Sequence, residues 1–392
     1  MIGAAAPGLS SEPAARATPE TRIARAGLLR MVEPPSAAMV QLVAEVGPEQ
    51  AWDLIVGGHV PQSCRRAVAA RTQGLTASQL QAAARRDLDV VAELGGEFIC
   101  PEDPQWPAAA FDSFQASGSG LFPPLGVYLR GTGLPLQPSG AVTIVGSRAS
   151  TEYGRRCASE IAAELAAHGL TIVSGAAFGI DAAAHRGALS VRGRGSTAAV
   201  LACGIDIVYP VAHRELVAEI ADRGALLSEY PPGTTPARHR FLARNRLIAA
   251  LASVTVVVEA GRRSGTVSTA NAAAALNRVV MAVPGPVTSA MSVGCHDLLR
   301  SGQVVIATNG QDVLEAAGVR TVLGAHEVPH RLTDDLSPVV GRVYEALPGS
   351  GTRTVRELAT EAGIPAVEVI AALAELDLVG LARADSGTWG RR

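Results

Sequence analysis

The chain has 392 residues, of which 48% are hydrophobic and only 4% aromatic. This length predicts two or three domains, with cores built mainly from Ala, Val and Leu. The net charge of −2 excludes a global basic field that would attract nucleic acid. Lys is absent, so all 34 Lys-plus-Arg positions are Arg, and each guanidinium can bind a phosphate through two parallel hydrogen bonds.

The five Cys residues are odd in number and widely spaced, without a C-x-x-C pair. This pattern indicates neither a disulfide framework nor a zinc site. No apolar run is as long as a membrane span, and the N-terminus lacks a basic region followed by an apolar one. We therefore expect a cytoplasmic protein without a metal site or a membrane contact.

Residues 1–21 are rich in Ala, Pro and Ser and are expected to form a disordered tail. In residues 22–94, apolar side chains recur at spacings of three and four, as in Leu28 to Met31 and Met39 to Val43. This pattern predicts several short helices in a small all-α domain of SAM/HhH-like type. Because no G-x-G hairpin is flanked by basic residues, packing against the neighbouring domain is favoured over nucleic-acid binding.

Residues 95–318 are predicted to form a Rossmann-like DNA-binding domain. Its first part, 95–138, is rich in Pro and aromatic residues and is expected to be an irregular strap on the sheet edge. Seven short apolar runs then alternate with amphipathic segments such as Arg155–His168 and Ala270–Asn277. The alternation predicts an α/β fold with a doubly wound, mostly parallel sheet that is buried on both faces. The predicted strands are Val142–Val145, Thr171–Val173, Thr197–Leu201, Leu226–Leu227, Val254–Val258, Val279–Val283 and Val304–Ile306.

After a linker over 319–336, residues 337–392 are predicted to form a winged-helix domain with three helices and a two-stranded wing around Gly387. The third helix would be the recognition helix. It carries Glu368, Glu375 and Asp377 and no Arg, a charge unsuited to a DNA groove. We expect this unit to contact protein or to pack.

Four of the predicted strands are followed by Gly turns rich in hydrogen-bond donors. They are Gly146–Arg148, Ser174–Asp181, Glu259–Thr266 and Pro284–Pro286. The carboxyl ends of parallel strands meet at one edge, where backbone N–H groups, helix starts and hydroxyls can hold phosphates. The first turn lacks the G-x-G-x-x-G fingerprint, and no Walker A motif is present. We therefore expect a phosphate site that takes neither NAD nor ATP, and no cofactor.

The segment Arg238–Arg246 holds four Arg, one His and Phe241, ahead of an expected helix at Leu247–Ala252. Spaced cations suit a chain of phosphates and a ring suits a base, which favours single-stranded DNA as the ligand. Alternatively, the segment is a solvated helix start in which Phe241 fills the core, with Asn245 and Arg246 bonding neighbouring loops.

A series of motifs in this chain resembles the DNA-processing protein A family, also called DprA or Smf. The motifs are VGSR at Val145–Arg148, SGAAFGIDAAAH at Ser174–His185, LACGIDIVYP at Leu201–Pro210, LLSEYPPG at Leu226–Gly233, RNRLIAALA at Arg244–Ala252, VVVEAGRRSGT at Val256–Thr266 and AVPGP at Ala282–Pro286. In this family FPxRNR is usual, whereas Leu242 stands here in place of the Pro, so we expect a changed turn after Phe241. The family's SGSLITA is here SGTVSTA, which keeps the hydroxyls.

The resemblance implies an extended Rossmann-like domain that binds single-stranded DNA. It also implies loading of the recombinase RecA during natural transformation, a homodimer, and no catalytic activity. By position, Ser147 and Arg148 would contact phosphate, Arg238 would be a cationic contact and Phe241 a stacking ring. The rest of the pocket would be Asn245, Arg246, Ser264 and Gly265, and the loops and the Arg-rich segment add Gly175, Arg244 and Thr266.

Four acid or base groups lie near these loops. Asp181 and His185 are four residues apart, and a structural role is favoured over an acid–base pair because no nucleophile accompanies them. Glu229 and Glu259 end strands on the ligand edge, so each is expected to pair with an Arg such as Arg148 or Arg246. Two other functions remain open. A phosphoribohydrolase-like enzyme would use PGGxGTxxE, of which Ser264-Gly265-Thr266 is a partial echo, and a purely structural protein would bind only a partner.

Overall fold

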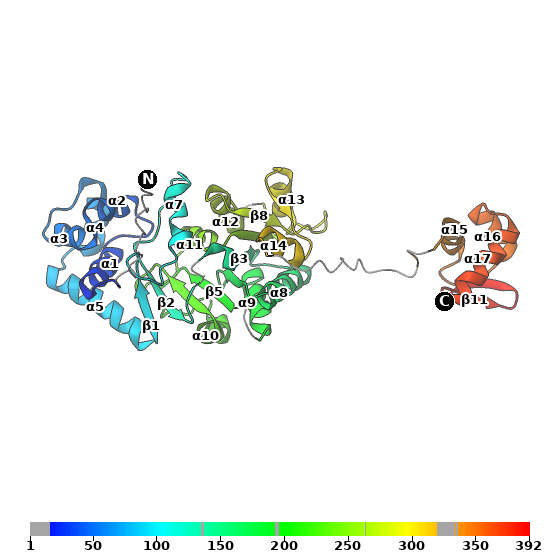
Figure 1. Ribbon diagram of the computed structural model, residues 1–392, viewed down its shortest axis with the longest axis horizontal. Helices are drawn as coiled ribbons and strands as arrows, with labels where there is room; N and C mark the ends of the chain where they lie inside the picture. Colours follow the sequence, from blue (N-terminus) through cyan, green and yellow to red (C-terminus); the bar gives the residue numbers. More distant parts are fainter. Residues whose placement is uncertain (1–15, 135–136, 193–195, 263, 320–332, 334–335) are drawn as a thin grey trace, which may run out of the picture. The chain divides into compact units, whose positions relative to one another are not determined.

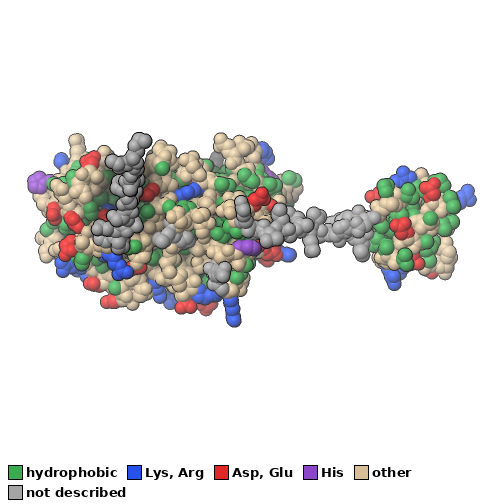
Figure 2. Space-filling model, in the orientation of Figure 1, with side chains coloured by type: hydrophobic (Ala, Val, Ile, Leu, Met, Phe, Trp, Pro, Cys, Tyr) green, Lys and Arg blue, Asp and Glu red, His purple; other side chains and the backbone are tan. Residues whose placement is uncertain are grey.

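The computed structural model describes residues 16–134, 137–192, 196–262, 264–319, 333 and 336–392. The chain divides into two compact units, Met1–Thr321 and Val322–Arg392, and each is described by itself. None of the helices in the described ranges is long and apolar enough to cross a membrane. Acidic and basic side chains are interspersed over the face shown in Figure 2.

A nine-stranded sheet forms the centre of the first unit, in the order β1-β2-β6-β5-β4-β3-β7-β8-β9 (Figure 1). The strands β3 to β9 run parallel, which confirms the predicted α/β class. The central strands are buried along their lengths because Val, Ile and Ala occupy both faces. The parallel strands are β3 (Ala141–Gly146), β4 (Thr171–Ser174), β5 (Ser196–Leu201), β6 (Ala225–Ser228), β7 (Val254–Val258), β8 (Val279–Ala282) and β9 (Val305–Ile306). The edge strand β9 is exposed, contrary to expectation.

The expectation of an irregular strap over 95–138 is wrong in one respect. This segment contains β1 (Gly96–Ile99) and β2 (Val127–Gly131), which pair antiparallel and add to the sheet edge beside β6. Between them lie the short helices α6 (Ala108–Phe111) and α7 (Ser113–Ala116). Aromatic rings pack together at this edge, where the ring centroids of Phe98 and Tyr128 are 4.9 Å apart. The segment therefore lies at the sheet edge, as expected, but as part of the sheet.

Helices cover both faces of the sheet. One face carries α8 (Glu152–Ala167), α9 (Ile180–Ser190) and α14 (Gly310–Ala316), whose apolar residues share a core with β3, β4 and β7. The other face carries α11 (Arg238–Ala250), α12 (Gly265–Ala275) and α13 (Val293–Arg300). The remaining helix, α10 (Arg214–Arg223), packs on β5 and β6 together with the N-terminal helices. The starts of α11 and α12 are thereby placed near the carboxyl ends of the strands.

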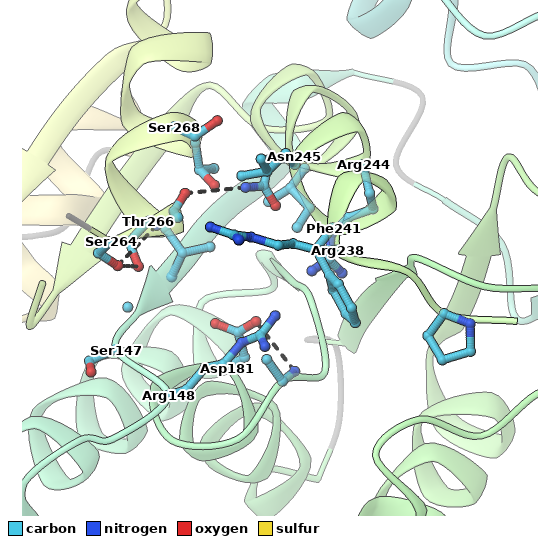
Figure 3. A pocket seen from close by; sticks show the side chains of 18 of the residues that line it. Ser147, Arg148, Asp181, Arg238, Phe241, Arg244, Asn245, Ser264, Thr266 and Ser268 are labelled. Atoms are coloured by element: carbon cyan, nitrogen blue, oxygen red, sulfur yellow. Dashed lines mark hydrogen bonds between the residues drawn. The ribbon is translucent and has the colours of Figure 1, made fainter. Parts of the chain in front are cut away.

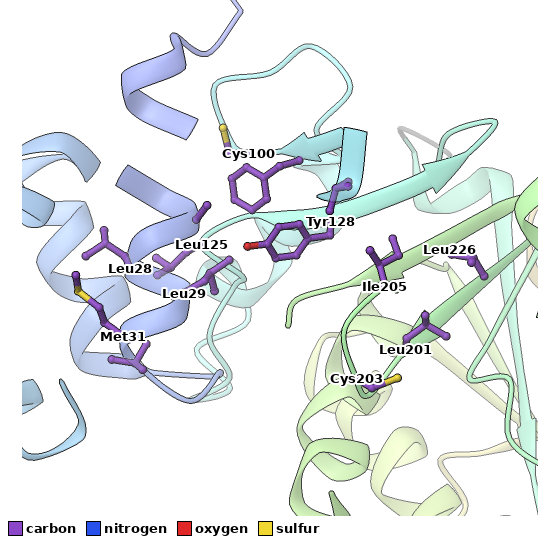
Figure 4. Packing of buried hydrophobic residues seen from close by; sticks show 14 of the residues in the cluster. Leu28, Leu29, Met31, Cys100, Leu125, Tyr128, Leu201, Cys203, Ile205 and Leu226 are labelled. Atoms are coloured by element: carbon purple, nitrogen blue, oxygen red, sulfur yellow. The ribbon is translucent and has the colours of Figure 1, made fainter. Parts of the chain in front are cut away.

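Five N-terminal helices share one core with the sheet. They are α1 (Pro19–Met31), α2 (Ala37–Val46), α3 (Pro48–Val56), α4 (Gln62–Thr72) and α5 (Ala77–Glu93). Leu28 and Leu29 belong to the same buried cluster as Tyr128, Leu201 and Leu226 of the sheet (Figure 4). The first helix also begins inside the expected tail, because the Thr18 side chain caps it and Pro19 suits its first position. Residues 1–15 of that tail lie outside the described residues.

The second unit contains α15 (Pro338–Ala346), α16 (Val355–Ala362) and α17 (Ala366–Leu378). They pack around a core with Val343, Leu358 and Leu373 at its centre. The expected pair of strands around Gly387 is present as β11 (Ala382–Asp385) and β12 (Thr388–Arg391), and β10 (Arg353–Thr354) adds a third strand beside β12. The order of the three helices is as predicted, and winged-helix remains a prediction for this unit. Most of the expected linker lies outside the described residues.

Candidate nucleic-acid interface

A cavity of about 840 Å³ opens at the carboxyl end of β3, between the first turns of α11 and α12 (Figure 3). We call it the α11 groove. Nine of the eleven residues predicted to bind DNA line it: Ser147, Arg148, Arg238, Phe241, Arg244, Asn245, Ser264, Gly265 and Thr266. Two predicted residues, Gly175 and Arg246, do not. The expectation that the strand-end turns converge on one edge is confirmed for the turns after β3, β4 and β7, which all contribute lining residues.

The Arg-rich segment is itself the start of helix α11 and does not precede it. With about 3.6 residues per turn, Arg238, Phe241 and Asn245 fall on one side and line the groove. Leu242 has the backbone N–H that a Pro would lack, and the helix runs through this position. A changed turn relative to proteins with Pro here stays a prediction. The helical period therefore decides which of the four arginines faces the groove.

Two exposed guanidiniums and two rings lie together in the groove. The Arg148 guanidinium carbon is 4.6 Å from the centroid of the Phe241 ring, within the range of a cation–π contact. Neither Arg148 nor Arg238 forms an ion pair within the described part of the chain. The ring of Tyr209, which is 42% exposed, lies 5.6 Å from that of Phe241. Tyr209 was not among the predicted site residues, although it lies in the LACGIDIVYP motif directly before Pro210.

Hydroxyls and a helix start form the opposite wall. Ser264 caps α12 by accepting a hydrogen bond from the Thr266 N–H at 3.1 Å, and its hydroxyl donates to the Thr266 hydroxyl at 2.8 Å. Asn245 donates to the Gly265 carbonyl at 3.2 Å and so joins α11 to α12. Ser147 is nearly buried, and its N–H donates to the Glu259 carbonyl. The positive end of the α12 dipole thus faces the two free arginines across the groove.

Arg244 and Arg246 are structural. Arg244 is buried in the groove wall and donates to the carbonyl oxygens of Gly175, at 2.9 Å, and Val200; its burial lowers its pKa. Arg246 is buried against Glu229, as one of the two expected pairings predicted. Gly175 packs against the Arg244 guanidinium, where a Cβ would approach the nearest nitrogen to 2.5 Å. Arg246 and Gly175 do not line the groove, and their DNA contacts stay predictions.

Comparisons with known proteins show which family the chain belongs to. The family model described as DNA recombination-mediator protein A matches residues 97–318, which span the whole sheet and the groove. The chain belongs to the DNA recombination-mediator protein A family. It is 44% identical over 375 residues to a putative DNA processing protein DprA of Mycobacterium tuberculosis, covering 94% of each chain. It is 36% identical over 258 residues to protein Smf of Escherichia coli, covering 64% of this chain and 67% of that one. The crystal structure of DprA from Streptococcus pneumoniae matches with a TM-score of 0.57 and 29% identity, over 77% of this chain and 98% of that one.

Membership of the recombination-mediator family confirms the resemblance drawn from the motifs.

The remaining polar residues of the site differ in how well they were predicted. Among the residues that the structure describes, Glu259 does not pair with an Arg, contrary to expectation. Its carboxylate accepts hydrogen bonds from the N–H of Thr151, at 2.8 Å, and from the Thr151 hydroxyl, at the start of α8. Asp181 lines the groove and accepts from the Ala177 N–H at 3.4 Å; its burial raises its pKa. Among the described residues, no three His, Cys, Asp or Glu side chains converge to hold a metal ion.

His185 has the structural role that was favoured. The hydroxyl of Thr197 donates to the Ile172 carbonyl at 2.7 Å, so the Nδ1–H of His185 donates to that hydroxyl oxygen, also at 2.7 Å. Nε2 then accepts from the Ala176 N–H at 3.3 Å. This network requires a neutral ring, and burial lowers the pKa of His185 to about 3. The ring therefore holds the turn after β4 that forms one side of the groove.

The buried neutral His185 predicts acid-sensitive stability. Below about pH 6.5 the unfolded chain protonates this His, whereas the folded chain resists protonation down to about pH 3. The unfolded state then binds more protons, so this group's stability is present above pH 6.5 and is lost as the pH falls, at up to about 1.4 kcal/mol per pH unit. Urea unfolding of wild type and His185→Gln between pH 4 and pH 7 would measure it. We expect the advantage of the wild type to shrink as the pH falls; two parallel curves would contradict the assignment. Asp181, whose raised pKa acts in the opposite direction, is present in both proteins.

Proposed function

We propose that the α11 groove binds single-stranded DNA and that the protein helps to load the recombinase RecA onto the strand during DNA uptake and recombination. The observation that carries this proposal is the stacking of the Arg148 guanidinium on the Phe241 ring beside Arg238. A strand needs a cation for each phosphate and a flat face for each base, and this corner of the groove offers both. We propose further that it acts without catalysis, as a cytoplasmic homodimer.

The groove favours a strand over a small nucleotide substrate. Its rings and free arginines lie at its outer part, where Tyr209 and Arg238 are exposed, so a chain could continue past them in both directions. The alternative of a phosphoribohydrolase-like enzyme would depend on Asp181, a carboxylate that lines the groove. Release of free base from a panel of nucleotides, abolished in Asp181→Asn, would favour that enzyme. We expect no release.

Titration of a labelled oligonucleotide at two salt concentrations tests the DNA site. Arg148→Ala is expected to weaken binding by about tenfold or more, since a charge-assisted hydrogen bond contributes about 1.5–3 kcal/mol. Loss of one phosphate contact should also reduce the slope of log K against log salt by about 0.7. Arg186→Ala is the matched control, because Arg186 is exposed on α9 and does not line the groove. If Arg148→Ala binds the oligonucleotide as tightly as wild type does, the groove is not the DNA site.

The recombinase step has its own test. The assay would follow ATP hydrolysis by RecA on single-stranded DNA that is first coated with a single-strand-binding protein. Wild type is expected to restore hydrolysis on coated DNA, and Arg148→Ala to restore it less in proportion to its weaker binding. Absence of any effect of the wild type would contradict the loading role while leaving the DNA site intact.

A further inference from the structure

A second cavity, of about 440 Å³, lies between the N-terminal helices and the loop after β6. We call it the Arg86 cavity. Its lining includes one arginine from each of three helices, Arg30 of α1, Arg71 of α4 and Arg86 of α5, together with Gln79 and Thr234. We propose that this cavity binds a phosphate of the same DNA strand that occupies the α11 groove. The inference rests on the proposed function of that groove and extends the bound strand onto the helical domain.

The arginines of the cavity differ in how far they are neutralised. Arg30 is held by Asp87, a carboxylate that is almost fully buried, with Nε to Oδ2 at 2.7 Å. Arg86 precedes that carboxylate on α5; it is exposed and forms no ion pair or hydrogen bond within the described residues. Arg30 is therefore fixed in place, and Arg86 offers a free guanidinium at the mouth of the cavity.

Arg71 lies on the opposite wall of the cavity, and its counter-ion also pairs with Arg240. It pairs with Glu33, and the same carboxylate accepts from Arg240 Nε at 2.7 Å and contacts His239 Nε2 at 3.0 Å. Burial, and then the positive charges of Arg240 and Arg30, lower the pKa of Arg71. One carboxylate cannot neutralise two guanidiniums, so the wall facing Arg86 also keeps positive charge.

The charges around the cavity leave an excess of one cation. The guanidiniums of Arg30, Arg71 and Arg86 line it, and a fourth, that of Arg240, shares Glu33 with Arg71. The carboxylates are Asp87, Glu33 and Asp206, the last of which accepts from the Gly233 N–H and acts on Asp87 through its charge. An excess of arginine at an open cavity, with the hydroxyl of Thr234 and the amide of Gln79 beside it, suits a phosphate oxygen better than a carboxylate or an apolar group.

Helix α11 connects the two cavities. Arg238 and Phe241 line the α11 groove, whereas Arg240, on the other side of the same helical turn, reaches Glu33 at the edge of the Arg86 cavity. The N-terminal helices lie together at one end of this unit, beside β1 and β2 (Figure 1). A strand that leaves the groove past Arg238 therefore meets α4 and α5 next.

Oligonucleotides of two lengths test this extension. We would titrate oligothymidylates of about 6 and about 30 nucleotides. Single-strand-binding modules occupy ~4–16 nucleotides, so the short strand lies near the lower end of this range and the long strand extends well beyond it. Arg86→Ala is expected to weaken binding of the long strand about fivefold to tenfold and to reduce its salt slope by about 0.7, with the short strand unaffected. Arg85→Ala is the matched control, because Arg85 is also exposed on α5 but does not line the cavity. It should bind both lengths as wild type does.

Three results would overturn the inference, and each has a distinct meaning. Equal binding of the long strand by wild type and Arg86→Ala would exclude the cavity while leaving the α11 groove intact. If inorganic phosphate raises the Tm of wild type but not of Arg86→Ala, and the long strand is unaffected, the cavity binds free phosphate only. Failure of wild type to bind either length would reject the proposed function and this extension together.

Discussion

Replacing Glu229 with Gln is expected to lower the free energy of unfolding by about 3–5 kcal/mol, the cost typical of breaking a buried ion pair from one side. The Glu229 and Arg246 side chains are 3% and 4% exposed, and two hydrogen bonds of 2.7 and 2.8 Å join them. Gln keeps the shape of Glu but removes its charge, so the Arg246 guanidinium would stay buried without a counter-ion. Urea unfolding followed by circular dichroism would measure the loss.

A double variant separates charge from packing. In Glu229→Leu combined with Arg246→Met, neither charge is buried, and most of the stability is expected to return because such replacements are often neutral or better. The Phe122 carbonyl, which now accepts from Arg246 Nε at 2.8 Å, would lose its partner and limit the recovery. A Glu229→Gln protein within about 1 kcal/mol of wild type would show that water or another group compensates Arg246.

Replacing Phe241 with Ala should cause the largest loss of strand binding among single groove variants. Stacking of a base on an aromatic ring contributes about 1–3 kcal/mol, which corresponds to about 5- to 150-fold in affinity. The change also removes the surface on which the Arg148 guanidinium rests, so that cation would lose its fixed position. Fluorescence anisotropy with a labelled oligothymidylate would measure the effect.

Two controls accompany this variant. Phe241→Trp keeps a flat ring and is expected to bind as wild type or more tightly. Phe178→Ala removes another exposed ring, 47% exposed and packed edge-on against His213, from outside the groove lining, and is expected to leave affinity unchanged. If Phe178→Ala lost as much affinity as Phe241→Ala, the strand would follow another path.

The parallel part of the sheet could be predicted because its strands are short runs rich in Val, Ile and Ala, and burial on both faces admits only a few polar residues, such as Thr197, that find a hydrogen-bond partner. The two antiparallel edge strands could not be predicted in the same way. Their pairing joins residues far apart in the chain, such as Tyr128 with Ser228, and the Pro residues between them suggest irregular structure. The exposed β9 has the composition of a core strand but lies at the end of the sheet.

The candidate site likewise combines features that the sequence predicts with features that only the fold shows. Composition placed four arginines around Phe241, but it could not show that Arg244 and Arg246 face two carbonyls and a carboxylate, whereas Arg238 faces the groove. If the predicted helix had begun at Arg238, the helical period would have separated the arginine that faces the groove from those that do not. Tyr209 could not be predicted, because only the fold brings the loop after β5 next to α11.

The core shared by the N-terminal helices and the sheet has a consequence for how the protein can be cut and recombined. Leu28 and Leu29 pack in one cluster with Leu201 and Leu226, so a shortened chain starting at residue 95 would present that apolar surface to water. The helical part is therefore not an interchangeable module that could be grafted between relatives without its sheet. Because of the same packing, the α11 groove and the Arg86 cavity belong to one rigid body, and the distance between them is fixed.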